Sequence, residues 1–292
     1  MRKSFGFILP LFFILLFSTS YAQTVSDSHV CQLGLTLSGG AARGYAHVGV
    51  LRAFEEAGIE IDYISGSSMG AVIGLFYAAG KTPDEMMIIA KGIKKRRLAS
   101  TCPVHLRKKG LDYMEQVIRK HIAEKTFDQL QKPLYVCVTN FESGRYEIIT
   151  QGELLPAVRA SAAIPIIYKQ QIINDVAYID GGVVNNLPVE PLRDCCEIVV
   201  GISVNPIEYK SEKMKLRKKI MRVSELMINE NEARRIEMCD YHLEVSELGS
   251  IDFEAYNQPQ KIHDMGYRAT KEFLAKNPEL FEYKRKTITL EK

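Results

Sequence analysis

A short run of small residues around Ser68 has the composition of a catalytic serine turn. It reads Gly66-Ser67-Ser68-Met69-Gly70 and fits the pattern G-x-S-x-G. In that pattern the serine occupies a sharp turn from a strand into a helix, and glycines two positions away on each side relieve backbone crowding. The helix that follows directs its positive N-terminal end at the site, which favours an oxyanion. The pattern predicts Ser68 as a nucleophile. Ser67 is off-centre, and a Gly/Ser turn without chemistry is the alternative.

A second run of small residues comes earlier in the chain, Gly39-Gly40-Ala41-Ala42-Arg43-Gly44. Consecutive backbone N–H groups in such a loop form an anion-binding concavity. It would hold an oxyanion in a hydrolase or a phosphate in a nucleotide-binding protein. The dinucleotide fingerprint needs a glycine where this chain has Ala41, and the lysine of a P-loop is missing. We interpret Arg43 as a cation that organises the loop or faces an anion.

The third run is Asp180-Gly181-Gly182, which follows an apolar, strand-like segment. It suits a carboxylate held at the end of a strand before a tight turn, although an ordinary Asp-Gly turn has the same composition. A Ser-His-Asp triad would require a histidine after the acid. His242 and His263 are the candidates, but they lie in strand-like and helix-like runs. The favoured interpretation of both is a packed or surface histidine.

The segments that must position these runs alternate between strand-like and helix-like patterns. Strands are expected at residues 33–37, 61–64, 134–139, 145–150, 172–179, 198–204 and 241–245. Helices are expected at 45–57, 71–79, 83–97, 154–163, 214–238 and 260–275. Glu142-Ser143-Gly144 predicts a hairpin turn. The alternation predicts an α/β fold, a three-layer α/β/α sandwich with a mostly parallel sheet.

Length and composition narrow the class of protein. The chain has 292 residues, 46% hydrophobic and 25% charged, with a net charge of +3. These values favour one globular domain and exclude a disordered or polytopic membrane protein. The small net charge does not indicate a nucleic-acid binder.

The first 22 residues have the pattern of a signal peptide. Arg2 and Lys3 precede an apolar run at 5–17, and Ser20-Tyr21-Ala22 fits a small-x-small cleavage site. The run is short for a membrane span, although an uncleaved anchor is the alternative. Gln23 follows, so a lipoprotein cysteine is absent at that position. We expect export to a periplasmic, outer-membrane-associated or extracellular location.

Six cysteines are scattered without the paired spacing of a zinc site. Export would permit disulfides. Cys137 and Cys196 lie beside apolar runs and are expected to be buried thiols, and no disulfide is assigned.

Four blocks in this order resemble those of bacterial patatin-like phospholipases. They are the glycine-rich loop and its helix at 39–51, the serine run at 66–70, the segment at 159–165 and the aspartate run at 180–188. The resemblance covers about residues 33–194, and the whole domain is expected to span 33–280. Patatin-like proteins have an α/β/α fold, which agrees with the pattern of elements.

The resemblance implies a Ser68–Asp180 dyad that cleaves carboxylic esters of phospholipids or lysophospholipids through an acyl-enzyme. The resemblance places the oxyanion on backbone N–H groups near Gly40 and Ala41. It implies a structural role for His47, and it implies no metal or organic cofactor. Many members carry a third glycine at the position of Ala41. An aspartate with an ordinary pKa of about 3.9 is a poor base at neutral pH. Burial must raise that pKa, or the oxyanion hole must carry most of the rate acceleration.

A lipid substrate would bring the protein to a membrane surface. Basic runs at 94–97, 107–109 and 210–222 would favour transient contact with anionic lipid. The helix expected at 83–97 carries apolar residues that fit a lid or the core. Two other classes remain, a non-catalytic lipid-binding or secreted interaction protein and a nucleotide-binding protein. The sequence leaves substrate specificity and oligomeric state open.

Overall fold

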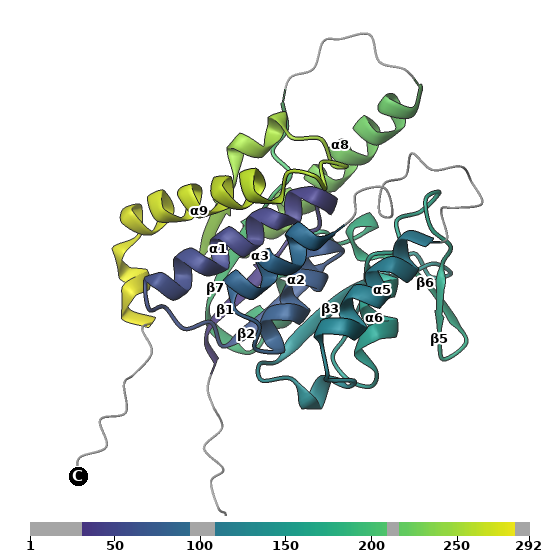
Figure 1. The fold of residues 1–292 in the computed structure, drawn as a ribbon, viewed down its shortest axis with the longest axis horizontal. Helices are drawn as coiled ribbons and strands as arrows, with labels where there is room; N and C mark the ends of the chain where they lie inside the picture. The colour runs from purple at the N-terminus through teal and green to yellow at the C-terminus, as the bar shows by residue number, and fades with distance from the viewer. Residues whose placement is uncertain (1–30, 94–108, 209–215, 284–292) are drawn as a thin grey trace, which may run out of the picture.

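A computed structural model describes residues 31–93, 109–208 and 216–283. In these residues eight strands form one sheet in the order β5-β6-β3-β2-β1-β7-β8, with β4 paired to β3 outside that path (Figure 1). The strands are β1 (Cys31–Leu37), β2 (Tyr63–Ser67), β3 (Leu134–Asn140), β4 (Tyr146–Ile149), β5 (Gln171–Ile173), β6 (Val176–Asp180), β7 (Cys196–Ser203) and β8 (Tyr241–Glu244). The run β3-β2-β1-β7-β8 is parallel, while β4, β5 and β6 pair antiparallel. The predicted α/β architecture with a mostly parallel sheet is confirmed.

Helices cover both faces of this sheet (Figure 1). The main core holds α1 (Tyr45–Glu56), α2 (Met69–Ala78), α3 (Pro83–Gly92), α5 (Lys109–His121), α6 (Leu154–Ser161) and α9 (Pro259–Lys276). A smaller core on the opposite face joins α7 (Glu190–Arg193) to the end of α8 (Leu216–Ile236). No helix of the described residues is both long enough and apolar enough to span a bilayer.

The central strand β1 is buried on both faces, as parallel strands under helices usually are. Leu33, Leu35 and Leu37 are fully buried and pack in the main core. Between them, a Cβ on Gly34 would lie 2.8 Å from Cys196 Sγ and 3.2 Å from Leu192 Cβ. The alternation of leucines with a small residue therefore lets α7 approach the back of the sheet closely.

The register of β3 brings the ends of two other strands together. On one side Ser67 of β2 pairs with Cys137, and on the other Asp180 of β6 pairs with Val138. Because the partners on β3 are consecutive, β2 and β6 end at almost the same height in the sheet. This register positions the serine run and the aspartate run as neighbours, although 112 residues separate Ser68 from Asp180.

The strand expected at 172–179 was wrong, because β5 and β6 form an antiparallel pair there. Asn174 and Asp175 have φ angles of 49° and 64° and connect Ile173 to Val176. A two-residue turn with positive φ at both positions closes a tight hairpin and favours Asn and Asp. The apolar residues on both sides hid this turn within an apparently continuous strand.

Other helix and strand boundaries differ from those expected from the sequence. The strand expected at 61–64 is β2 at Tyr63–Ser67, and α2 begins at Met69, so the serine run is itself the junction of strand and helix. The helix α5 was not predicted, although Leu111, Met114 and Ile118 have helical spacing. The expected helix at 83–97 ends at Gly92, and its last four positions lie outside the described residues. The expected signal peptide at 1–22 also lies outside them.

One expectation about the cysteines was wrong and one is confirmed. Cys196 is bonded to Cys31, with a Cα–Cα distance of 4.5 Å. The two residues are register partners on β1 and β7, a parallel pairing that sequence spacing does not reveal. Cys137 is a fully buried free thiol, as expected, and burial raises its pKa well above the ordinary value.

The disulfide predicts a stability that depends on oxidation. It links residues that are 165 positions apart in the sequence. For a loop of that size the chain-entropy model gives a stabilisation of the folded state of about 5 kcal/mol. We expect Cys196→Ser to lower the melting temperature and to abolish the further loss that a reductant causes in the wild type. Calorimetry with and without reductant measures this, with the free thiol variant Cys239→Ser as the matched control. Equal melting temperatures for Cys196→Ser and the oxidised wild type would contradict the assignment.

Candidate active site

Ser68 lies at a sharp turn between β2 and α2. Its φ and ψ are 51° and −121°, a conformation that costs energy for a residue with a side chain. A Cβ on Gly66 would lie 2.5 Å from the carbonyl carbon of Gly70, and one on Gly70 would lie 2.2 Å from Leu37 O. Neither glycine tolerates a side chain, which is the steric requirement expected of the G-x-S-x-G turn.

The hydroxyl of Ser68 faces a buried carboxylate. Ser68 Oγ donates a hydrogen bond of 2.6 Å to Asp180 Oδ2, and the Gly182 N–H donates one of 2.8 Å to Asp180 Oδ1. One carboxylate oxygen is thus held by the backbone of the aspartate run while the other points at the serine. The geometry matches a nucleophile beside a proton acceptor.

Burial tunes the proton affinity of this carboxylate. Asp180 is 5% exposed, and loss of hydration raises its pKa to about 7 against the opposing effect of its bonds from Ser68 and Gly182. A carboxylate with this pKa is a competent proton acceptor near neutral pH. Of the two possibilities that the sequence left open for Asp180, the structure supports the raised pKa.

A second serine fixes the backbone of the turn. The Ser68 N–H donates to Ser161 Oγ over 2.9 Å, and Ser161 Oγ donates in turn to Cys137 O over 2.7 Å. Ser161 is the last residue of α6 and is fully buried. It therefore ties the strained turn to β3. Ser161 had no predicted role, and its only signal in the sequence was its place in the block at 159–165.

The glycine-rich loop lies against Ser68. A Cβ on Gly39 would come within 2.9 Å of Ser68 Cβ. In the described part of the chain we find no hydrogen bond from the N–H groups of Gly40 and Ala41 to another residue. Ala41 adopts a positive φ of 46°, so alanine occupies the left-handed conformation that a third glycine would favour. Two N–H groups without a partner among the described residues, in a loop that packs against Ser68, suit an oxyanion hole.

Arg43 organises the loop and does not face the serine. It is buried, its Nε donates to Ile251 O over 2.8 Å, and its guanidinium lies 4.1 Å from the centre of the Phe253 ring. Glu225 Oε1 lies 3.8 Å from Arg43 Nη2. The preceding residue, Ala42, donates its N–H to Phe253 O. These contacts fasten the loop to residues 251–253 and leave Arg43 without the exposure that a phosphate-binding role requires.

The described histidines nearest to such a role, His47, His242 and His263, do not complete a triad. His242 Nε2 lies 3.0 Å from Ser203 Oγ, and His263 Nδ1 lies 2.9 Å from Asp264 Oδ1. His47 Nε2 donates to Ser38 O over 2.8 Å, and burial lowers its pKa to about 4, so it is a neutral scaffold residue. Among residues 31–93, 109–208 and 216–283, no histidine is hydrogen-bonded to Ser68. The same residues contain no cluster of His, Cys, Asp and Glu placed to hold a metal ion.

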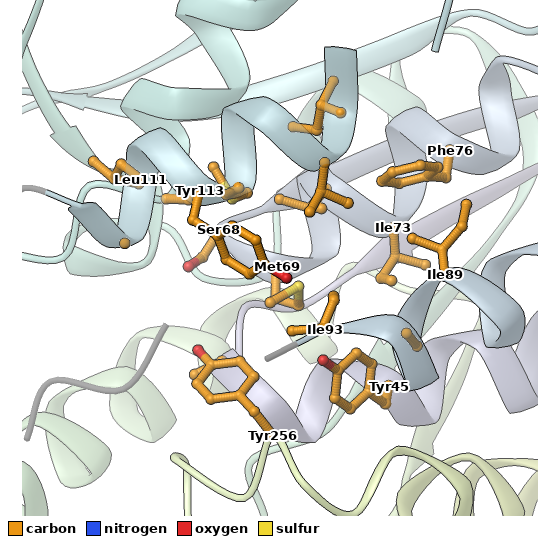
Figure 2. Close-up of a pocket in the computed structure, with 18 of the residues that line it drawn as sticks. Tyr45, Ser68, Met69, Ile73, Phe76, Ile89, Ile93, Leu111, Tyr113 and Tyr256 are labelled. Carbon is orange, nitrogen blue, oxygen red and sulfur yellow. The ribbon is translucent and has the colours of Figure 1, made fainter. Parts of the chain in front are cut away.

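An apolar pocket opens beside Ser68 (Figure 2). It is partly open to solvent, and Ser68 is among the residues that line it. Apolar side chains from α1, α2, α3, α5 and the segment after α6 dominate its lining: Val48, Met69, Val72, Ile73, Phe76, Met86, Ile89, Ile93, Leu111, Met114, Val117, Ile118 and Ile164. Figure 2 shows Phe76 and Ile89 well separated from Ser68 along this lining. The arrangement can hold an apolar chain whose polar end reaches the serine.

The helix α3 forms part of this pocket. Met86 and Ile89 line it, while Ile88 points away and is 72% exposed. The apolar residues expected at 83–97 fitted either a lid or the core. Met86 and Ile89, on the inner face of α3, belong to the packed wall of the pocket.

A family model for patatin-like phospholipases matches residues 35–193, more than half of the chain. This chain belongs to the patatin-like phospholipase family. The matched residues include the glycine-rich loop, Ser68, Ser161 and Asp180.

Several curated proteins are similar to it. An uncharacterised NTE family protein of Mycobacterium tuberculosis is 32% identical over 191 residues, which are 64% of this chain and 53% of that protein. The lysophospholipase NTE1 of Mycosarcoma maydis is 28% identical over 283 residues, which are 83% of this chain and 15% of that protein. The chain thus spans about half the length of the mycobacterial relative and a small part of the fungal one.

A solved structure is also similar. VipD from Legionella pneumophila has a TM-score of 0.48 and 15% identity, with 85% of this chain and 67% of that chain covered. A likeness of this strength does not bear on activity.

The buried carboxylate predicts how stability changes with pH. The pKa of Asp180 is about 7 in the fold and 3.8 ordinarily, so between these values the folded state binds a proton that the unfolded chain releases. The contribution of Asp180 to stability is present below about pH 4 and is lost as the pH rises to 7. Asp180→Asn should therefore gain stability relative to wild type between pH 5 and pH 8, by at most about 4 kcal/mol. Urea unfolding of both proteins at each pH tests this, and identical pH profiles would contradict it.

Proposed function

We propose that the chain is a serine hydrolase that cleaves carboxylic esters of phospholipids or lysophospholipids through a Ser68–Asp180 dyad. The observation that carries this proposal is the 2.6 Å hydrogen bond from Ser68 Oγ to a buried Asp180 whose pKa is about 7. Membership of the patatin-like phospholipase family and the apolar pocket beside Ser68 support it.

In the proposed first step Ser68 Oγ attacks the ester carbonyl carbon while its proton passes to Asp180 Oδ2. The negative charge that develops on the carbonyl oxygen accepts hydrogen bonds from the N–H groups of Gly40 and Ala41. When the intermediate collapses, the alcohol leaves with the proton from Asp180, and the acyl group stays on Ser68. Water then attacks the acyl-serine, gives a proton to Asp180, and the fatty acid departs as that proton returns to Ser68.

We propose one long acyl chain as the part of the substrate that the pocket holds. Ser68 borders the pocket, so an ester at its mouth would place a hydrocarbon chain along α2 and α3. Burial of each methylene contributes about 0.8 kcal/mol, which supplies binding without a charged contact. The similarity to a fungal lysophospholipase agrees with a substrate that carries one chain.

Export and transient membrane contact belong to the same proposal. The charged and apolar pattern of residues 1–22 supports export, and so does the disulfide between Cys31 and Cys196, since disulfides persist in oxidising compartments. We propose that residues 33–280 form the hydrolase domain and that it makes transient contact with a lipid surface. Most of the basic runs expected to favour that contact lie outside the described residues.

The dyad is tested with purified protein on short- and long-chain esters and on lysophospholipid. Ser68→Ala and Asp180→Asn should each reduce kcat by at least about 10³-fold, because they remove the nucleophile and its base. Ser67→Ala is the matched control, since Ser67 is the buried neighbour whose hydroxyl bonds to none of the described residues, and it should keep its activity. Retained activity in Ser68→Ala would contradict the assignment. An inactive wild type that still binds lipid would favour the non-catalytic lipid-binding alternative.

The pocket is tested with two adjacent isoleucines on α3. Ile89 lines the pocket and Ile88 is exposed, so Ile89→Phe should narrow the cavity and Ile88→Phe should not. We expect Ile89→Phe to lower kcat/KM at least tenfold for a sixteen-carbon ester and to spare a four-carbon ester, because only the longer chain should reach that part of the pocket. Ile88→Phe should leave both rates unchanged. An unaltered chain-length profile in Ile89→Phe would show that the acyl chain binds elsewhere.

A further inference from the structure

A buried carboxylate that the proposed chemistry does not use lies behind the glycine-rich loop. Glu232, near the C-terminal end of α8, is 1% exposed. It accepts hydrogen bonds from two side-chain amides, one from Asn186 Nδ2 and one of 2.9 Å from Asn205 Nδ2. Ser203 is a third donor to it. A carboxylate this deep in a protein is costly unless its partners hold it in place.

The same two amides also bind the loop. Asn205 Nδ2 donates to Gly39 O over 2.6 Å, and Asn186 Nδ2 donates to Gly39 O over 3.2 Å. A side-chain amide nitrogen carries two protons, so each asparagine gives one to Gly39 O and one to Glu232. Because both partners are acceptors, the orientation of the two amides is fixed. Glu232 therefore holds two side chains that together hold one backbone carbonyl.

That carbonyl determines where the next N–H points. The peptide between Gly39 and Gly40 is planar and trans, so the Gly39 C=O and the Gly40 N–H point in opposite directions. The asparagines draw the carbonyl toward Glu232, which turns the Gly40 N–H away from α8. Gly39 also packs against Ser68, since a Cβ on Gly39 would come within 2.9 Å of Ser68 Cβ. The peptide is thereby clamped immediately beside the serine.

We propose that Glu232 is a positioning residue, which acts through Asn186 and Asn205 to aim the Gly40 N–H at the oxyanion. The inference rests on the proposed function, because it needs a reaction in which an oxyanion develops. It goes beyond the Ser68–Asp180 dyad by making the long helix α8 part of the catalytic scaffold. Glu232 touches no reacting atom. Because the Gly40 N–H would stabilise charge that develops only in the transition state, loss of Glu232 should lower kcat and leave KM nearly unchanged.

The test compares Glu232→Gln with Glu230→Gln. Glutamine keeps the size of Glu232 but replaces one acceptor oxygen and the charge with an amide, so it cannot receive all three donors. Glu230 is an exposed glutamate two residues away on α8, and its variant is expected to match wild type. Glu232→Gln should lower kcat at least tenfold with KM changed less than twofold, since loss of one oxyanion donor costs about 10²–10³-fold. Its affinity for a trifluoromethyl ketone analogue should fall by the same factor as kcat/KM.

The readouts separate this role from a structural one. All rates are divided by the fraction of sites that a fluorophosphonate labels to completion, so a partly unfolded variant does not count as a slow one. Asn205→Ala removes the shorter bond to Gly39 O and should show the same loss in kcat alone if Glu232→Gln folds poorly. Wild-type kcat and analogue affinity in both variants would overturn the inference and leave the proposed function standing. A wild type without ester hydrolysis would overturn both.

Discussion

The hydrogen bond from Ser68 to Asp180 is the interaction on which the rest of the site depends. It requires a serine in a strained turn and a carboxylate taken out of water, and neither would persist alone. The register of β3 brings the serine and the carboxylate together. Ser67 of β2 pairs with Cys137 and Asp180 of β6 pairs with Val138, so the two strands end side by side. Burial makes the charged form of Asp180 unfavourable and so raises its pKa to about 7. With this pKa the carboxylate can accept a proton near neutral pH.

The strain at Ser68 is held from two sides. Ser161 Oγ accepts a hydrogen bond from the Ser68 N–H and donates one to Cys137 O of β3. The glycine-rich loop also packs against Ser68. That loop is anchored through Arg43 to residues 251–253 and through two asparagines to Glu232. Segments from the C-terminal third of the chain thus fix a loop that follows the first strand. The family match ends at residue 193, so Asn205, Glu232 and residues 251–253 lie beyond it, while Asn186 lies within it.

The sequence predicts local chemistry well and tertiary partners poorly. The turn at Ser68 and the carboxylate at Asp180 follow from small-residue patterns, whose steric causes are local. The bond between Cys31 and Cys196, the support from Ser161 and the clamp of Glu232 depend on strand order and helix placement, which no spacing along the chain reveals. The hairpin turn at Asn174 did have a local signal, but flanking apolar residues outweighed it.

The proposed chemistry requires that a buried Asp180 with a pKa near 7 acts as the base for Ser68. The most direct measurement is kcat/KM for a soluble ester from pH 4 to pH 9. The reactive form is the deprotonated carboxylate, so kcat/KM should rise about tenfold per pH unit below pH 7 and level off above it. A profile that is flat across this range, or that levels off near pH 4, would contradict the role assigned to Asp180 and its burial.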